Sequence, residues 1–510
     1  MLMGRPALSA GVVERTTPGV PHGRDTPAIA VPLFFSSLAL LSFALVQCLG
    51  DARTHAGWAT QVAIACLAWY ATFVATCVRR LGAAYSFSHI YVICLAMFHL
   101  GLVIPVGIGV FSFPGMIQDP WYERASWCSA MALGCLGCGF ALALKSNGAR
   151  AAPRHADGAD APVKDRMRSY GVGLLLASLA SVLLMVNQLG NIFSYARLDL
   201  FSGAGDVRGL GLFTFTLPSA AILLVVGARR PSHFVLATLV SLVGFVLFMV
   251  TGYRTLALFP LLSGAVIWRR TGRTIPAWLA VGGMVFVLVA IPAILQLRLS
   301  TTRLSSISAQ SVGAAFGKAD AADTFRELGG TVGVLAKSME LVPDKDSYRY
   351  GSSYLLALGE MLPNFSTQSR RWDRDIVLSK SGAARDEALR STALSTWMSY
   401  RILDDISFSL GYGTGFTAIG EPYVNFGLPG VILFFALLGF LLGWLDQKSL
   451  LEHPGWLLFM SVAFWHFTNT VRNDMPNFTK PLAFLYVCLL IWYAAMSVFH
   501  PSSTERASRS

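Results

Sequence analysis

The stretch from Gly413 to Phe435, GTGFTAIGEPYVNFGLPGVILFF, decides where the last apolar part of the chain begins. Several glycines, one carboxylate and a Tyr-Val-Asn-Phe-Gly cluster lead directly into a long apolar run. An ionisable side chain is costly inside a lipid bilayer, and such residues often mark functional sites. We therefore expect Glu421 to lie at the edge of a membrane span, where a functional loop meets the bilayer.

The composition of the chain predicts an all-α polytopic membrane protein. Of 510 residues, 54% are hydrophobic, 12% are aromatic and only 13% are charged, which is more apolar than a soluble domain of this size. A bilayer core about 30 Å thick needs roughly 20 mostly apolar residues per helix. Candidate spans by this criterion are 29–49, 57–78, 87–111, 124–144, 170–189, 210–228, 233–251, 254–268, 275–296, 426–444, 455–471 and 481–499. We therefore expect about 12 transmembrane helices.

Basic residues in the connections between spans predict the orientation, because Lys and Arg are retained on the cytoplasmic side. One set of connections and tails holds 19 Lys and Arg residues, and the opposite short loops hold seven. The tails 1–28 and 500–510 are therefore expected in the cytoplasm, with spans in 29–296 and 426–499. The large polar segment 297–425 is expected in the periplasm. Its 14 basic residues balance its 14 acidic ones, so the net charge of +12 lies on the cytoplasmic side. This charge is a topology signal and gives no support for nucleic-acid binding.

The segment 297–425 is the largest polar unit, and its apolar spacing predicts short amphipathic helices. Residues 352–362 and 386–406 carry apolar side chains three and four positions apart, which favours helices on a membrane surface. No phosphate-binding loop, zinc-protease pair or nucleophile elbow occurs in the chain, so ATP-driven transport and zinc hydrolysis are disfavoured. Cys135 and Cys138 have CxxC spacing in an apolar helix, where packing is favoured over metal binding. We expect no metal and no cofactor.

Arginines gather at the predicted outer ends of the spans. The set comprises Arg197, Arg254, Arg298, Arg303 and Arg472. Arginine binds phosphate oxygens with two nitrogens at once and stays charged when partly desolvated, so a membrane-borne diphosphate is a suitable ligand. The alternative for each residue is a side chain that reaches the lipid headgroups. Arg254 lies in a tight turn, which favours the binding role there.

Together these features resemble the Wzy-type O-antigen polymerases, which join oligosaccharide repeat units. The resemblance rests on Gly413, Gly415, Glu421, Tyr423, Asn425, Phe426, Gly427 and Gly430, on the turn Gly252-Tyr253-Arg254, and on a large outer loop before the last three spans. It implies a GT-C-like helical fold in the bacterial inner membrane. It also implies transfer of a glycan from undecaprenyl diphosphate to another lipid-linked repeat unit on the periplasmic face, without metal or nucleotide sugar. A chain-length regulator and a flippase are then the candidate partners beside the bilayer.

The implied reaction gives these residues distinct candidate roles. The acceptor hydroxyl must lose a proton, and the leaving diphosphate needs positive charge. Glu421 is the candidate base, against the alternative that it complements the positive end of the helix that follows. His466 is the second candidate base, although a histidine between two aromatics is typical of a packed core. Tyr423 and Asn425 are candidate sugar-binding residues, against interface packing.

Three functions remain open from the residues alone. The first is the polymerase, and the second is an O-antigen ligase that transfers the glycan to lipid A core. The third is a non-enzymatic glycan exporter or flippase. An exporter is expected to have charged residues along a path through its helices, and here the charges lie at the ends of spans. The polymerase is therefore the preferred hypothesis.

Overall fold

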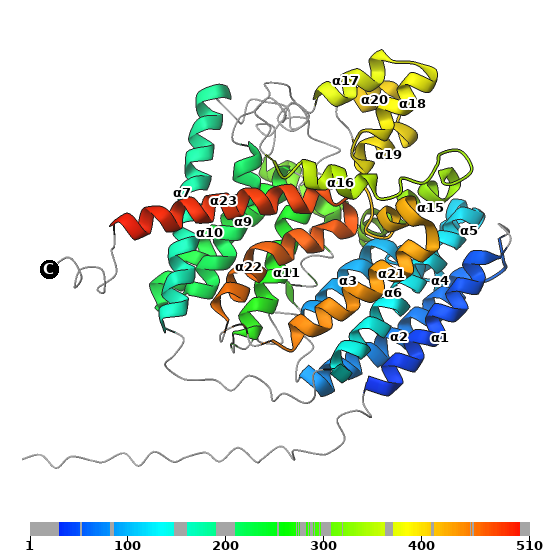
Figure 1. Ribbon diagram of the computed structural model, residues 1–510, viewed down its shortest axis with the longest axis horizontal. Helices are drawn as coiled ribbons and strands as arrows, with labels where there is room; N and C mark the ends of the chain where they lie inside the picture. The colour runs from blue at the N-terminus through cyan, green and yellow to red at the C-terminus, as the bar shows by residue number, and fades with distance from the viewer. Residues whose placement is uncertain are drawn as a thin grey trace, which may run out of the picture.

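The computed structural model describes most of the helices before residue 297, most of the segment 308–409, and the helices from residue 420 onward. Described are residues 30–50, 54–81, 86–146, 161–189, 210–251, 254–271, 308–318, 320–362, 371–409, 413–448, 450 and 453–499, with short stretches between 273 and 296. The structure is 84% helical, and no strand occurs in the described part. The prediction of an all-α fold is confirmed (Figure 1).

Seven of the helices in the described part are long and apolar enough to cross a membrane. They are α1 (Ala30–Leu49), α2 (Trp58–Leu81), α6 (Pro120–Ser146), α7 (Ala161–Leu189), α10 (Pro231–Thr251), α21 (Gly420–Asp446) and α23 (Pro476–Phe499). Shorter helices at predicted spans are α3 (Phe87–His99), α4 (Val103–Gly107), α9 (Leu210–Gly227), α11 (Arg254–Arg270) and α22 (Pro454–Asn469), which ends in the 3₁₀ turn η3 (Thr470–Arg472). Most of the predicted span 275–296 lies outside the described residues.

Two predicted spans differ from single straight helices. The span 87–111 divides into α3 and α4, because Pro105 cannot donate the backbone hydrogen bond that a continuous helix needs. The span predicted to start at residue 426 belongs to a longer helix, α21, which begins at Gly420. This helix is kinked at Gly427, where φ is 68° and ψ is −156°. Glycine adopts this conformation without a steric penalty. Residues 420–426 thus form a short helical segment ahead of the main span.

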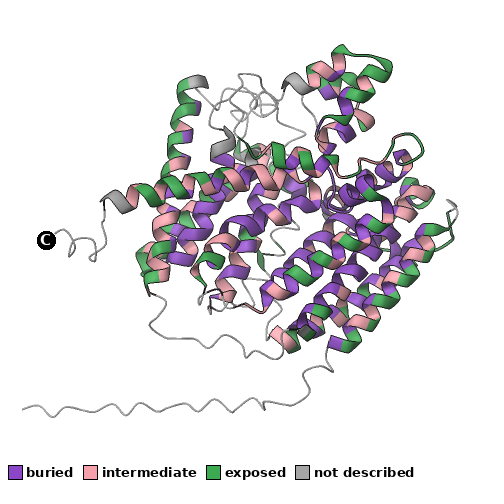
Figure 2. Ribbon diagram, viewed as in Figure 1, coloured by how far each residue is buried: buried purple, intermediate pink, exposed green. Residues whose placement is uncertain are grey.

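Small residues let α6 and α21 pack closely at the centre of one helical group. A Cβ atom at Gly439 of α21 would clash with the carbonyl oxygen of Leu136, and one at Gly139 of α6 would clash with that of Ala436. Such small-residue contacts are typical of helices that pack in membranes. The amide of Gln447 also donates to Ala143 O at 3.2 Å, so the two helices run in the same direction. α6 is almost wholly buried, and exposed residues lie on the outside of the bundle (Figure 2).

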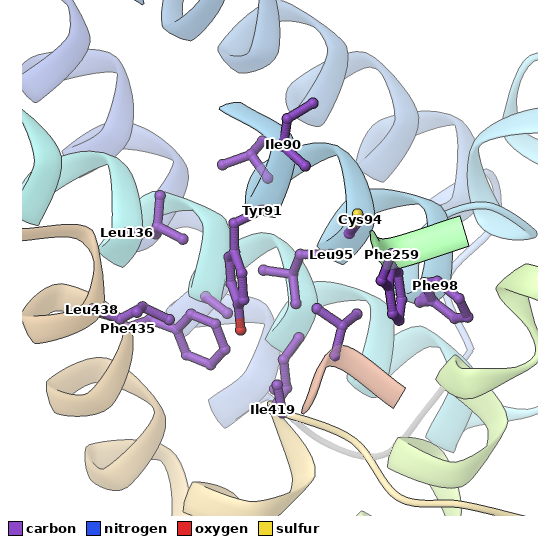
Figure 3. Packing of buried hydrophobic residues seen from close by; sticks show 14 of the residues in the cluster. Ile90, Tyr91, Cys94, Leu95, Phe98, Leu136, Phe259, Ile419, Phe435 and Leu438 are labelled. Atoms are coloured by element: carbon purple, nitrogen blue, oxygen red, sulfur yellow. The ribbon is translucent and has the colours of Figure 1, made fainter. Parts of the chain in front are cut away.

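α3 lies between this group and the helices α11 and α22. Figure 3 shows Tyr91 of α3 pointing into a cluster that contains Leu136, Phe435 and Ile419. These residues are all buried, and burial of apolar area is the main stabilising contribution to such a core. Because Ile419 directly precedes α21, this packing fixes where α21 begins.

The two ends of the bundle differ in charge. The end where α21 begins is called here the Glu421 end. At the opposite end, the guanidinium of Arg270 donates to Lys448 O at 2.6 Å, and Arg229 pairs with Asp165 at 2.5 Å. Arg79 and Arg80 lie in the last turn of α2, and Lys145 lies in the last turn of α6. These basic residues, from the connections predicted to be cytoplasmic, therefore lie at the end opposite Glu421.

The segment between the two helical groups folds into short helices above the Glu421 end (Figure 1). They are α13 (Ala309–Gly317), α14 (Ala321–Gly329), α15 (Thr331–Leu341), α16 (Ser352–Gly359), α17 (Arg371–Ser379), α18 (Gly382–Arg390), α19 (Leu394–Ile402) and α20 (Asp405–Ser409). In 386–406, Leu389 and Trp397 do not lie on a membrane surface as expected but are buried within the protein, whereas Ile402 and Ile406 are exposed. The Trp397 ring lies 6.3 Å from that of Phe416. In α16, by contrast, Leu355 and Leu358 are exposed.

Candidate functional site

The first segment of α21 is built by a local cap and a glycine break. Thr417 Oγ1 accepts hydrogen bonds from Ile419 N at 3.1 Å and Gly420 N at 3.0 Å. Backbone N–H groups at a helix start lack intrahelical partners, so a side-chain acceptor there stabilises the helix. Gly427 then interrupts the helix. The short segment between cap and break presents Glu421 and Asn425 to one side, one helical turn apart.

The Glu421 carboxylate connects three parts of the chain that are distant in sequence. Its Oε1 atom accepts from Ser353 Oγ at 2.8 Å, and its Oε2 atom accepts from Met475 N at 2.8 Å. Glu421 is only 4% exposed. No described residue forms an ion pair with it, although a buried charge is normally paired. Glu421 is therefore a buried carboxylate held by two neutral donors.

Asn425 completes the cluster around Glu421. Its Nδ2 atom donates to Ser353 Oγ and to Glu421 O, each at 2.8 Å, and its Oδ1 atom accepts from Gly351 N at 2.8 Å. The backbone adds two more bonds, from Arg349 N to Val424 O and from Tyr350 N to Asn425 O. Residues 349–353 are thereby fixed against the start of α21.

A second buried carboxylate, Asp474, stands beside this cluster. Its Oδ2 atom accepts from Ser395 N at 2.8 Å, and its Oδ1 atom accepts from Asn477 Nδ2 at 2.5 Å. Ala393, the residue before α19, provides no side-chain hydrogen bond to the start of the helix. Asp474 therefore caps α19 from a distant part of the chain. Asp474, which caps α19, is followed directly by Met475, whose N–H donates to Glu421.

Two of the predicted arginine positions lie at this end of the bundle. Arg472 is half-buried in η3, and its carbonyl oxygen accepts from Phe416 N at 3.0 Å. Gly415 has φ +71°, and a Cβ there would lie 2.8 Å from Arg472 O, so a glycine is required. Arg254 is the first residue of α11. α11 packs against α22, and Arg270 at its other end contacts Lys448 just before α22. The two helices therefore run in opposite directions, which puts Arg254 and η3 at the same end.

The remaining predicted site residues have different surroundings. Arg197, Arg298 and Arg303 lie outside the described residues. Tyr423 is buried, and its hydroxyl donates to Val342 O at 3.1 Å. His466 is buried in α22, with its ring against Trp465 and 5.8 Å from that of Phe215. The described contacts of His466 do not include the Glu421 cluster.

Sequence reasoning missed three residues of this region. Ser353 and Asp474 hold the cluster together, but one lies in a predicted surface helix and the other in a short turn, so no spacing relates them to Glu421. The third is Arg124 of α6, whose Nε atom donates to Cys48 O at 2.9 Å. Burial raises the pKa of Tyr348, and the Arg124 charge opposes that shift. α15, which leads into the loop that precedes Ser353, packs against α6, so Arg124 in the first turns of α6 lies at the same end of the bundle as this loop. The sequence signal that could have found Arg124 is its position at the predicted outer end of the span 124–144.

The arrangement suits acid–base and anion-binding chemistry. No group of three His, Cys, Asp or Glu side chains with the geometry of a metal site occurs in the described part of the chain. The cluster contains a buried carboxylate that has no cation partner among the described residues, and two arginine positions lie at the same end of the bundle. A carboxylate of this kind can accept a proton, and an arginine can stabilise a leaving anion.

Comparison with known proteins identifies the family. No curated protein matches the chain, and no solved structure does. The family of O-antigen polysaccharide polymerase Wzy matches residues 33–500, which is nearly the whole chain. This match favours repeat-unit polymerisation over the ligase and the exporter. It agrees with the apolar helices in indicating a multi-pass membrane protein. The chain belongs to the Wzy family of O-antigen polysaccharide polymerases.

Proposed function

We propose that the protein transfers a glycan from an undecaprenyl diphosphate carrier to a sugar hydroxyl of a second lipid-linked repeat unit. The acceptor oxygen attacks the anomeric carbon of the donor glycan. The bond between that carbon and the diphosphate oxygen breaks, and the diphosphate leaves with the electron pair. The acceptor proton passes to Glu421. The energy of the glycan–diphosphate bond drives the reaction, so no nucleotide sugar is needed.

The observation that carries this proposal is the burial of Glu421 without a cation partner in the described part of the chain. Its two hydrogen bonds come from Ser353 Oγ and Met475 N, and each carboxylate oxygen keeps a second lone pair. The donors hold the carboxylate in one orientation, and such a positioned group is what general base catalysis requires. An acceptor hydroxyl that reaches it would find the base already oriented.

Arg254 and Arg472 are the proposed partners of the leaving diphosphate. The start of α11 at Arg254 and the turn η3 support this role, since both lie at the Glu421 end. Two arginine forks can bind several phosphate oxygens as negative charge develops on them. Arg197, Arg298 and Arg303 are proposed for the same role from their sequence positions. A GT-C-like arrangement of these helices is part of the proposal.

The proposed reaction takes place on the periplasmic side of the inner membrane. The support is the charge of the opposite end, which holds Arg229, Arg270 and Lys145 and which the positive-inside rule assigns to the cytoplasm. Undecaprenyl-linked glycans on the outer leaflet would then reach the Glu421 end directly. A chain-length regulator and a flippase are the proposed partners in this process.

Exchange of Glu421 for glutamine tests the proposal. In Glu421→Gln the new carbonyl oxygen can accept from Met475 N and the new amide can donate to Ser353 Oγ, which also accepts from Asn425 Nδ2, so the glutamine keeps both contacts of the glutamate. Loss of the base should reduce polymer by a factor on the order of 10² to 10⁴. The readout is surface glycan length on a gel, from a polymerase-null strain that carries the variant at normal membrane level.

Glu123 supplies a matched control for this test. Glu123 is also 4% exposed and in the first turn of its helix, but its described contacts are with His55, whose N–H donates to it at 2.8 Å and whose ring lies at 2.9 Å, and not with the cluster. Glu123→Gln should keep long chains. Long chains from Glu421→Gln at normal protein level would reject Glu421 as the base and move the proposal to His466.

A further inference from the structure

Tyr350 has an unusual backbone conformation for an exposed tyrosine. Its φ is +48°, and no other non-glycine residue in the described ranges has a positive φ. The side chain is 76% exposed. The left-handed region is disfavoured for residues with a Cβ atom, and such outliers gather at functional sites. An exposed ring also gains little from burial, so packing does not account for this conformation.

The backbone around Tyr350 is held rigidly from both sides. Tyr350 N donates to Asn425 O at 3.1 Å, and Gly351 N donates to Asn425 Oδ1 at 2.8 Å. On the other side, Arg349 donates to the carbonyl oxygens of Arg390 and Leu389, and its guanidinium lies 5.6 Å from the Trp397 ring centroid. Burial lowers the pKa of Arg349 to about 10. These contacts fix the main chain and leave the Tyr350 ring projecting outward.

Tyr350 belongs to a group of aromatic rings beside the Glu421 cluster. The Tyr348 ring meets the Tyr350 ring edge-on, with centroids 6.1 Å apart. On the other side, Tyr354 and Phe426 stack with centroids 6.5 Å apart, and Phe426 is 48% exposed. Burial, and after it the Glu421 carboxylate, raises the pKa of Tyr354. Tyr354 directly follows Ser353, whose hydroxyl donates to Glu421 at 2.8 Å, so these rings border the proposed base.

The side chains next to Tyr350 in sequence indicate that its ring faces water and not the lipid. Asp344, Lys345 and Ser347 are exposed just before it, and charged groups are costly in hydrocarbon. The exposed leucines, Leu355 and Leu358, follow on α16. A ligand on the Tyr350 ring is therefore a water-soluble group, and the substrates of this family are sugars.

We propose that Tyr350, with Tyr348 and Phe426 beside it, is a binding platform for sugar rings of the glycan next to the transfer site. The apolar C–H face of a sugar stacks on the phenol ring, and its hydroxyl groups remain in water. This inference rests on the proposed function, since it assumes that transfer occurs at the Glu421 end. The platform holds the glycan between successive additions, so its loss shortens the polymer but does not stop transfer.

Three substitutions at Tyr350 separate the ring from the backbone. Tyr350→Phe keeps the ring, Tyr350→Ala removes it, and Tyr350→Gly removes it and also relaxes the positive φ. An aromatic contact of ordinary strength corresponds to roughly a two- to tenfold change in binding. We expect Ala and Gly to shorten the modal chain by a factor of that order, whereas Phe keeps it. The readout is the glycan ladder from a polymerase-null strain at equal membrane protein level.

Tyr493→Ala is the matched control, because Tyr493 is a 60% exposed tyrosine on α23, away from the platform. It should leave the ladder unchanged. Wild-type chain lengths from Tyr350→Ala would overturn the proposal, and so would normal lengths from Tyr350→Gly beside short chains from Tyr350→Ala. Both results leave the proposed function intact, because transfer itself is tested separately by Glu421→Gln and by the reporter fusions.

Discussion

The Oε2 atom of Glu421 accepts a hydrogen bond from Met475 N at 2.8 Å. This bond joins the first turn of α21 to the residue before α23, although 53 residues separate the two in sequence. The same carboxylate holds Ser353 of the segment above the bundle. A shift of any of these three parts of the chain would move the proposed base. The position of Glu421 therefore depends on the whole Glu421 end.

Asn425→Ala should destabilise this end. The substitution leaves Gly351 N without its acceptor and removes a donor from Ser353 Oγ. An unsatisfied buried group costs about 1–3 kcal/mol, so we expect a lower melting temperature of the purified protein in detergent and less polymer. The control is Asn477→Ala, which removes one bond to Asp474 and should lower the melting temperature less. An unchanged melting temperature in Asn425→Ala would contradict the assigned role of Asn425.

Gly427→Ala should also destabilise the protein, through the backbone. Gly427 has φ 68° and ψ −156°, a region that is almost confined to glycine and costs other residues on the order of 1–3 kcal/mol. A Cβ atom there would lie 3.1 Å from the Tyr348 hydroxyl. Thermal unfolding monitored by size-exclusion chromatography measures the effect. Gly455→Ala is the control, because a Cβ at Gly455 meets nothing within 4 Å. Equal melting temperatures of the two variants would show that the kink at Gly427 is not required.

Arg254→Lys should lose most polymerisation if Arg254 binds the diphosphate. A lysine keeps the charge but cannot bind two phosphate oxygens with a planar fork. Arg269→Lys changes the same residue type at the opposite end of α11 and should stay active. The measurement is the glycan ladder at equal protein level. Full activity of Arg254→Lys would leave Arg254 with an anchoring role at the headgroups.

The orientation of the chain predicts the activity of reporter fusions. A periplasm-active reporter fused after residue 350 should be active, and one fused near residue 160 should be inactive, because basic connections stay in the cytoplasm. The reverse pattern would place the Glu421 end in the cytoplasm. It would then reject the proposed periplasmic reaction.

The sequence by itself determined the class of the protein and the helical character of most spans. Apolar runs such as 124–144 and 426–444 specify helices locally, because a backbone in hydrocarbon must satisfy its hydrogen bonds within the helix. The glycine, carboxylate and aromatic residues of 413–430 also indicated the family, which the match over residues 33–500 confirmed. The sequence also made Glu421 a candidate site residue, because a carboxylate at the edge of a span is rare; its role as the base stays a prediction.

Only the tertiary structure decided which residues surround Glu421. Ser353 and Met475 reach it from segments whose local patterns carry no information about α21, because contacts between distant segments depend on how the helices pack. Packing likewise buried Trp397, which periodicity alone had assigned to a membrane surface. The positive φ of Tyr350 follows from its bonds to Asn425. Local sequence specifies helices through period and composition, whereas the geometry of a site is fixed by hydrogen bonds and packing between elements.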